Sequence, residues 1–220
     1  MKPALGWLFS GSFDAPLVAD SWDDQLSSKA NGKTLQEAGV GVMVVALYAH
    51  PVFAGDMREA VRKQIAEVEA FVRRRRRWAI ARHASEADTL LRQGKRVIVL
   101  SLEGAAGVLE SEADLREFID ERGIAIVTPL HLVDDRFGGA ALLDGAQRVA
   151  NPIALIDGRQ RRLVDRGFED GIVRNQRGLT LMGKRLLIEL VRRGVWIDLT
   201  HASDAAVEQM MPILEAAGQP

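Results

Sequence analysis

The chain has 220 residues with a net charge of −1, so its overall charge points to neither nucleic acid nor an anionic membrane as a partner. Hydrophobic residues make up 47% and charged residues 27%, the balance of a globular protein rather than a disordered one. Cysteine is absent, which excludes disulfides, a thiolate nucleophile and a cysteine zinc site, so any metal must be held by histidine and carboxylate.

The length suits one α/β domain, and we expect residues 1–220 to form a single domain. No apolar run approaches the roughly 20 residues that span a bilayer. The apolar patch from Ala4 to Phe9 is shorter than the core of a signal peptide, about 7 to 15 residues. We therefore expect a cytoplasmic protein, exported if a leader precedes this sequence.

Residues 1–35 carry short apolar pieces broken by proline and glycine. Among them, FDAPLVADSW is a candidate strand that ends near Asp20. The run from Gly41 to Tyr48 is continuously apolar, as expected for a strand that is covered on both faces. His50 follows this strand and precedes Pro51, which favours a structural role for it.

From Asp56 onward the apolar residues take helical spacing. Val61, Ile65, Val68 and Val72 would line one face of a helix that ends in the run from Arg73 to Arg77. Five arginines invite a nucleic-acid interpretation. Cations at the end of a helix also complement its dipole, however, and no aromatic residues are interleaved with these arginines and no second basic cluster accompanies them. We interpret the run as a solvated helix end and predict no nucleic-acid partner.

Two capping boxes predict the starts of the next two helices, and each helix is closed by a glycine: Ser85 with Asp88 before Gly94, and Ser111 with Asp114 before Gly123. Each glycine leads directly into a short apolar strand. Helices that alternate with buried strands indicate a parallel sheet with right-handed crossovers.

The strands end in residues that can carry chemistry. Glu103, His131 and His201 each follow an apolar run that begins just after a glycine. Because ligands and catalytic groups gather at the carboxyl ends of parallel strands, these side chains could face one shared opening. The stretch between His131 and Leu179 is rich in turn signals, with a little helix expected around residues 155–163, and could cover that opening.

Helices return near the end of the sequence. One is predicted before Gly194, with Leu186, Leu190 and Val191 on one face. Ser203 is the expected cap of the last helix, whose inward positions are Val207, Met210, Met211 and Leu214.

Three segments, SLEGAAGVL, TPLHLVDDRFGG and GLTLMGKRLLIELVRRGVWIDLTHAS, together resemble the membrane (renal-type) dipeptidases, peptidase family M19. The similarity runs from about Leu35 to Leu214. It implies an amidohydrolase-like (β/α)8 TIM barrel with two zinc ions at the carboxyl ends of its strands. It also implies a zinc-dependent metallodipeptidase whose metal-bridging hydroxide attacks the peptide carbonyl of a small dipeptide.

The resemblance also implies roles for single residues. Glu103 matches the carboxylate that bridges both metals, and His201 matches a ligand of one zinc. His131 matches the histidine that contacts the substrate or its tetrahedral intermediate. The family's first strand carries Asp-x-His-x-Asp, whereas the first 49 residues here contain no histidine, which leaves Asp20 as the candidate acid from that motif.

Family members take a further histidine, an arginine and an aspartate from strands beyond the one that ends at His201. We therefore expect a shortened or divergent member, a partial barrel of about five β/α units. Its open edges would need cover from another segment or from a second copy of the chain. The alternatives are a catalytically inactive scaffold of the same fold and an amidohydrolase that acts on another amide or a lactone.

Overall fold

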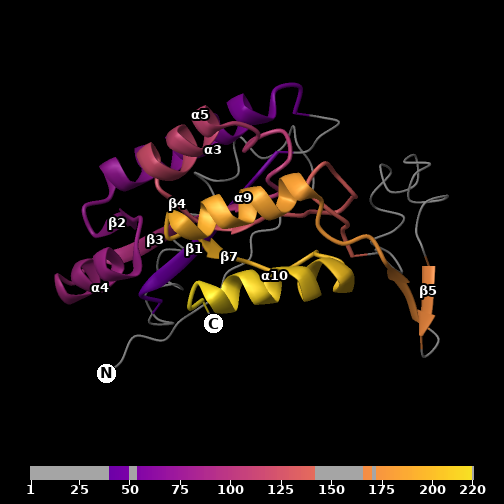
Figure 1. Cartoon of the computed structure of the whole chain (residues 1–220). Coiled ribbons are helices and arrows are strands. Elements are labelled where there is room, and N and C mark those ends of the chain that lie inside the picture. The colour runs from indigo at the N-terminus through magenta and orange to yellow at the C-terminus, as the bar shows by residue number, and fades with distance from the viewer. Residues whose placement is uncertain (1–39, 50–53, 142–165, 170–171, 220) are drawn as a thin grey trace. The chain divides into compact units, whose positions relative to one another are not determined.

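The computed structural model describes residues 40–49, 54–141, 166–169 and 172–219, and these form two units (Figure 1). The first comprises Met1–Leu102 and Arg116–Ile126, and the second comprises Glu103–Leu115 and Val127–Pro220. The candidate strand near Asp20, the residue His50 and the expected helix around residues 155–163 lie outside the described residues.

The first unit is built on strands that alternate with helices, in the order β1 (Val42–Tyr48), α3 (Met57–Arg74), β2 (Trp78–Ala81), α4 (Ala84–Arg92), β3 (Arg96–Glu103), the π-helix η1 (Arg116–Glu121) and β4 (Ile124–Thr128). Strand β3 pairs with β1, β2 and β4. Its pairing with β2 is parallel, with Ile80 opposite Ile98. Val97, Ile98 and Leu100 are fully buried, so β3 is covered on both faces. The predicted α/β class with a parallel sheet is confirmed.

Helix α3 begins where the sequence predicts. The side chain of Asp56 accepts a hydrogen bond from Glu59 N at 3.1 Å and caps the helix. Val61, Ile65 and Val68 are buried as expected, but the fourth buried position is Phe71 rather than the half-buried Val72. The larger ring takes the place of the smaller side chain and meets Trp78 edge to face, with ring centroids 5.7 Å apart.

In this unit one strand was not predicted and one predicted helix cap was wrong. Strand β2 was missed, because its four residues follow the arginine run and are too short to show a period. Helix α4 begins after His83, so Ser85 lies inside its first turn and does not cap it. Glu86 instead bonds the backbone ahead of the helix, where its Oε2 accepts from Arg82 N at 2.8 Å.

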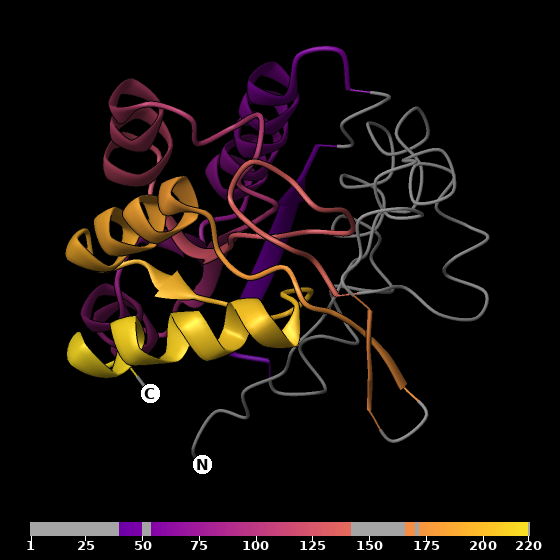
Figure 2. The ribbon, with the colours of Figure 1, turned by 45° about the vertical axis from the view of Figure 1, so that its right-hand side comes forward.

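The second unit contains the last two residues of β4 and the elements α5 (Glu112–Leu115), β5 (Arg166–Glu169), β6 (Ile172–Asn175), α9 (Leu181–Arg192), β7 (Trp196–Ile197) and α10 (Asp204–Ala216). Helices α9 and α10 lie side by side, and α9 also contacts β7 (Figure 2). Asp198 N donates to Val127 O at 2.9 Å, which joins the end of β7 to the end of β4. The hairpin of β5 and β6 was not predicted.

Local capping in the second unit follows the sequence closely. Ser111 Oγ accepts from Asp114 N at 3.2 Å, the first bond of a capping box, and donates to Asp114 Oδ2 at 2.8 Å. Ser203 Oγ accepts from Ala206 N at 3.0 Å at the start of α10. Gly194, which follows α9, has φ +74°, the left-handed conformation expected of a glycine that ends a helix. Among the described residues, no helix combines the length and apolar character needed to cross a membrane.

Candidate metal centre

Three of the predicted site residues come together in the second unit. Glu103 is the last residue of β3, His131 lies three residues beyond β4, and His201 lies four residues beyond β7. The Nε2 atoms of His131 and His201 lie 3.4 Å and 3.3 Å from Glu103 Oε1. The two imidazole rings meet edge to face with centroids 4.6 Å apart. One ligand atom from each residue lies within 4.8 Å of the other two.

The charge of Glu103 is set by these two histidines. Hydrogen bonding from His131 and then from His201 lowers the pKa of the Glu103 carboxyl to about 2, against the opposing effect of burial. The Glu103 side chain is 26% exposed and that of His131 is 9% exposed. Glu103 is therefore an ionised carboxylate at neutral pH, in a partly dehydrated position beside two imidazole nitrogens.

A glycine allows the strand ends of Glu103 and His131 to approach each other. Gly104 has φ +91°, and a Cβ atom on it would lie 3.3 Å from His131 Cβ. Its backbone N–H donates to Thr128 O at 3.0 Å, and the next N–H, from Ala105, donates to Pro129 O at 3.2 Å. The loop after Glu103 is thus bonded directly to the segment that leads to His131.

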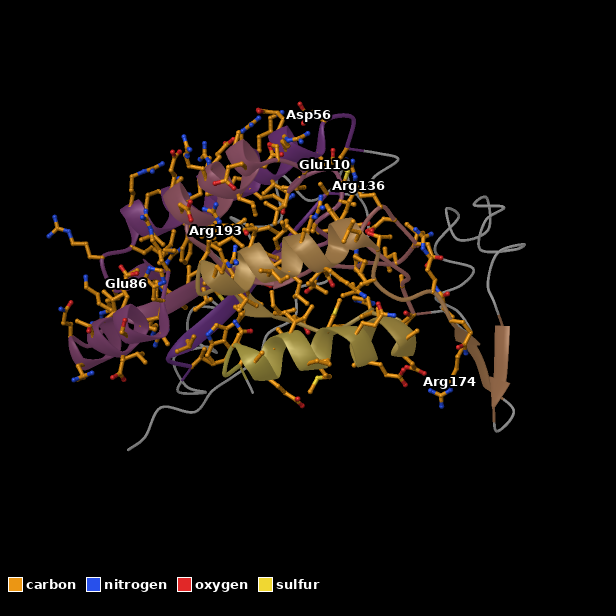
Figure 3. The ribbon with its side chains drawn as sticks, viewed as in Figure 1. Asp56, Glu86, Glu110, Arg136, Arg174 and Arg193 are labelled. Atoms are coloured by element: carbon orange, nitrogen blue, oxygen red, sulfur yellow. The ribbon has the colours of Figure 1, made fainter. Side chains whose placement is uncertain are left out.

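A surface ion pair joins the same two loops farther out. Arg136 Nη1 lies 2.9 Å from Glu110 Oε2, and the two labelled side chains lie close together in Figure 3. Glu110 belongs to the loop after Glu103, and Arg136 belongs to the loop after His131. The Arg136 side chain is 44% exposed, so the pair adds little stability by itself.

Left-handed backbone occurs at His201 and at Leu132, the residue that follows His131. Leu132 and His201, with φ of +61° and +65°, are the non-glycine residues with positive φ in the described part of the chain. A tight turn at Leu132 is closed by Val133 N, which donates to His131 O at 2.7 Å. Left-handed backbone at residues other than glycine is found mainly where the surrounding structure enforces it, and such positions cluster at functional sites.

Asp198 supports the approach to His201 and was not predicted. Its Oδ2 accepts from Thr128 Oγ1 at 2.8 Å, and its Oδ1 accepts from Thr200 N at 3.0 Å. The carboxylate therefore fastens the turn before His201 to the end of β4. The bond from Thr200 N could have been predicted from the sequence, because an aspartate commonly accepts a hydrogen bond from the backbone N–H two residues later. The contact with Thr128 depends on strand order.

The donor set of these residues fits a zinc ion. One carboxylate oxygen and two imidazole nitrogens are ligand types that zinc accepts, and catalytic zinc normally has three protein ligands. The sequence placed Glu103 and His201 at the metal and His131 at the substrate, whereas the geometry makes all three available as ligands. Asp20, the third predicted ligand, lies outside the described residues.

Solved structures of known proteins share this fold. One is the dipeptidase AC, a metallopeptidase of family M19, with a TM-score of 0.64 and 18% identity over 88% of this chain and 55% of that one. Another is a metallopeptidase from Rhodobacter sphaeroides liganded with a phosphinate mimic of the dipeptide L-Ala-D-Ala. It has a TM-score of 0.64 and 16% identity over 90% of this chain and 58% of that one.

A third is the probable dipeptidase PvdM from Pseudomonas aeruginosa, with a TM-score of 0.61 and 17% identity over 82% of this chain and 42% of that one. This chain thus spans about half the length of the solved structures that it resembles. No curated protein sequence matches it significantly.

The family model of the membrane dipeptidases matches residues 7–155, which is more than half of the 220-residue chain. The match includes Glu103 and His131 and agrees with the barrel-like fold of the solved structures. The chain belongs to the membrane dipeptidase family, peptidase family M19.

Proposed function

We propose that this protein is a metallodipeptidase that hydrolyses dipeptides with the help of zinc. The observation that carries the proposal is the convergence of Glu103, His131 and His201 in a chain of the membrane dipeptidase family. A solved structure with the same fold, that of the Rhodobacter sphaeroides metallopeptidase, holds a phosphinate mimic of a dipeptide. A tetrahedral phosphinate resembles the intermediate of amide hydrolysis, which makes a dipeptide the first substrate to test.

Each residue of the group has a distinct task in this proposal. The ionised carboxylate of Glu103 and the imidazole of His201 would hold the metal, and Asp20 would add a further carboxylate. Zinc, when bound, supplies a Lewis acid for the peptide carbonyl and lowers the pKa of water. The buried imidazole of His131 would donate an N–H toward the carbonyl oxygen, where negative charge develops during hydrolysis.

The test begins with the metal. The purified chain is freed of metal with a chelator, titrated with Zn²⁺, and assayed for hydrolysis of L-Ala-L-Ala before and after zinc is restored. We expect zinc to bind and hydrolysis to depend on it. Glu103→Gln keeps the shape of the side chain but removes its charge, so it should weaken zinc binding more than 100-fold, beyond the roughly 10- to 100-fold typical of residues that only support a ligand.

Glu112→Gln is the matched control, because Glu112 is a carboxylate of the same unit that is 62% exposed and pairs with Arg193. It should bind zinc as the wild-type chain does. Wild-type protein that neither binds zinc nor cleaves the dipeptide would contradict the proposal and favour an inactive scaffold.

A second candidate is an amidohydrolase that acts on another amide or on a lactone. It is favoured by the fold shared with an amidohydrolase from Pseudomonas aeruginosa, with a TM-score of 0.58 and 14% identity over 82% of this chain and 45% of that one. A substrate panel that sets dipeptides beside simple amides and lactones separates the two. Chelator-sensitive hydrolysis of a lactone, with none of a dipeptide, would replace the first candidate by the second.

A further inference from the structure

A buried polar pair joins the loop after His131 to the end of strand β6. The side chain of Asp134 is 7% exposed, and Asn175 is 3% exposed. Asn175 Nδ2 donates to Asp134 Oδ1 at 2.7 Å. A carboxylate buried to this degree is costly unless hydrogen bonds and charge satisfy it, so its partners define what it holds in place.

The pair is hydrogen-bonded to both backbone groups of Ala140, its N–H and its C=O. Ala140 N donates to Asp134 Oδ1 at 2.9 Å, while Asn175 Nδ2 donates to Ala140 O at 2.7 Å. Ala140 itself is fully buried. Arg177 completes the arrangement, because its Nη1 lies 3.6 Å from Asp134 Oδ2 and its backbone N donates to Asn175 Oδ1 at 3.0 Å.

The residues on either side of Ala140 hold the turn at His201. Ala141 N donates to His201 O at 2.7 Å, and Ser203 N donates to Gly139 O at 3.0 Å. These bonds lie on both sides of an antiparallel bridge between Ala140 and Ala202. They fix the backbone on both sides of the left-handed conformation of His201, which would otherwise relax toward a more favourable one.

The other histidine is close to the pair along the chain, because Asp134 lies three residues after His131. The Asp134 carboxylate is thus bonded to the segment that holds the turn at His201 and belongs to the loop that begins at His131. We propose that Asp134 and Asn175 are positioning residues that hold His131 and His201 against Glu103 in the geometry for metal binding. The metal-binding part of this inference rests on the proposed function, whereas the spacing of the two histidines does not.

A purely structural role is the alternative, and Asp114 provides the matched control for it. Asp114 as a whole residue is 7% exposed. It belongs to the same unit and accepts hydrogen bonds from Glu110 N and Ser111 Oγ at 3.0 Å and 2.8 Å. Its carboxylate, like that of Asp134, is largely removed from solvent and hydrogen-bonded, but its bonds hold the start of α5 rather than the turn at His201. Asp114→Ala should therefore lower stability without changing the histidines.

The experiment measures Zn²⁺ affinity of the full chain by competition with a chromogenic chelator, at a temperature where circular dichroism shows every variant to be folded. Asp134→Ala and Asn175→Ala should each weaken zinc binding about 10- to 100-fold, the usual effect of losing a residue that orients a metal ligand. Asp134→Asn keeps an oxygen that can accept from Ala140 N and should restore most of the affinity. Asp114→Ala should stay within about twofold of wild type.

Two results would overturn the inference when the wild-type chain binds zinc. Either Asp134→Ala and Asn175→Ala bind zinc as wild type does, or Asp114→Ala weakens binding as much as they do. If Asp134→Ala does not fold, Asn175→Ser carries the same test, because serine is too short to bond Asp134 and Ala140 together.

A wild-type chain that fails to bind zinc would refute the proposed function, and a measurement on metal-free protein then decides the inference. With ring centroids 4.6 Å apart, the imidazole protons of His131 and His201 should give a cross-peak in a nuclear Overhauser spectrum. We expect Asp134→Ala to lose this cross-peak and Asp114→Ala to keep it. A cross-peak that survives in both variants would show that Asp134 does not set the spacing of the rings.

Discussion

The strand end at Glu103 and the turn at Asp135 each hold a partly buried carboxylate, yet the pKa values of the two groups move in opposite directions. At Glu103 two imidazoles lower the pKa to about 2. At Asp135 burial raises the pKa to about 6, although Phe137 N and Gly138 N donate to its Oδ1 at 2.7 Å and 3.3 Å. At Glu103 the two imidazoles outweigh burial, whereas at Asp135 burial outweighs the backbone donors and the charge of Arg177.

Glu103 is surrounded by groups that suit a candidate cation site, whereas Asp135 is bonded by the loop that it shapes. The donors around Glu103 are side chains that can take on positive charge or bind a metal, whereas those on Asp135 Oδ1 are backbone amides of its own turn. A buried acid that only shapes a turn is more stable in its neutral form, and Asp135 shows that tendency. Glu103 keeps its charge because the site supplies groups that stabilise it.

The largest expected effect comes from removing the imidazoles. In a His131→Ala/His201→Ala double variant, burial alone should act on Glu103, and its pKa should rise from about 2 to above its ordinary value of 4.5. Because its pKa is lowered in the folded state, the wild-type Glu103 carboxylate stabilises the fold above pH 4.5, and this contribution is lost as the pH falls toward 2. The double variant should not show this loss of stability in acid. Carbon-13 NMR of the carboxyl group measures the pKa. An unchanged pKa would show that the two imidazoles do not cause the difference between Glu103 and Asp135.

A smaller effect is expected at Asp135, where the contribution to stability is lost as the pH rises rather than as it falls. Its raised pKa means that the folded state holds the proton more tightly than the unfolded state does. The contribution to stability is therefore complete below pH 3.8 and is lost as the pH rises through about 6. Asp135→Asn imitates the neutral form, so above pH 6 it should unfold with a free energy larger than wild type by on the order of 2 kcal/mol. Urea denaturation at pH 4 and pH 7 tests this, and equal differences at both values would contradict it.

The capping box at Ser111 should produce the next smaller change. Its hydroxyl bonds both the backbone N–H and the carboxylate of Asp114, so Ser111→Ala leaves two buried groups of that residue with fewer partners. We expect a loss of about 1 kcal/mol, the usual cost of a missing helix cap. Thermal denaturation measures the loss. Zinc affinity should not change, and a large change in it would show that this cap is coupled to the metal centre.

The smallest effect is expected at the exposed carboxylate of Glu112. Its partner Arg193 is 18% exposed, but Glu112 itself is 62% exposed, so water and salt screen the pair. Glu112→Gln should change the free energy of unfolding by less than about 1 kcal/mol. A larger loss in urea denaturation would mean that exposure is a poor guide to the role of carboxylates in this protein.

Local sequence rules were sufficient for Glu103, which ends the buried strand β3 that its apolar run predicts. They were not sufficient for His201, which lies four residues beyond β7, a two-residue strand whose Trp196 is 58% exposed. The caps at Asp56, Ser111 and Ser203 were also predictable, because each involves atoms within three residues in the sequence. The place of Glu103 and the helix caps therefore follow from local pattern.

The hydrogen bonds that hold the candidate ligands in place do not follow from local sequence pattern. Asn175 bonds Asp134 across 41 positions of sequence, and Thr128 bonds Asp198 across 70. Such contacts depend on which loops the sheet brings together, and no periodicity in the sequence encodes that. The false cap at Ser85 shows the converse, because the helix begins two residues earlier than this local motif predicts, with His83 at the cap position.

The left-handed backbone of His201 sets folding stability against the chemistry proposed for this position. Glycine or asparagine would adopt a φ of +65° at lower cost, by about 1 to 3 kcal/mol for glycine, so folding stability alone favours another residue there. We expect sequences of this fold in which position 201 has no task to carry glycine or asparagine at it.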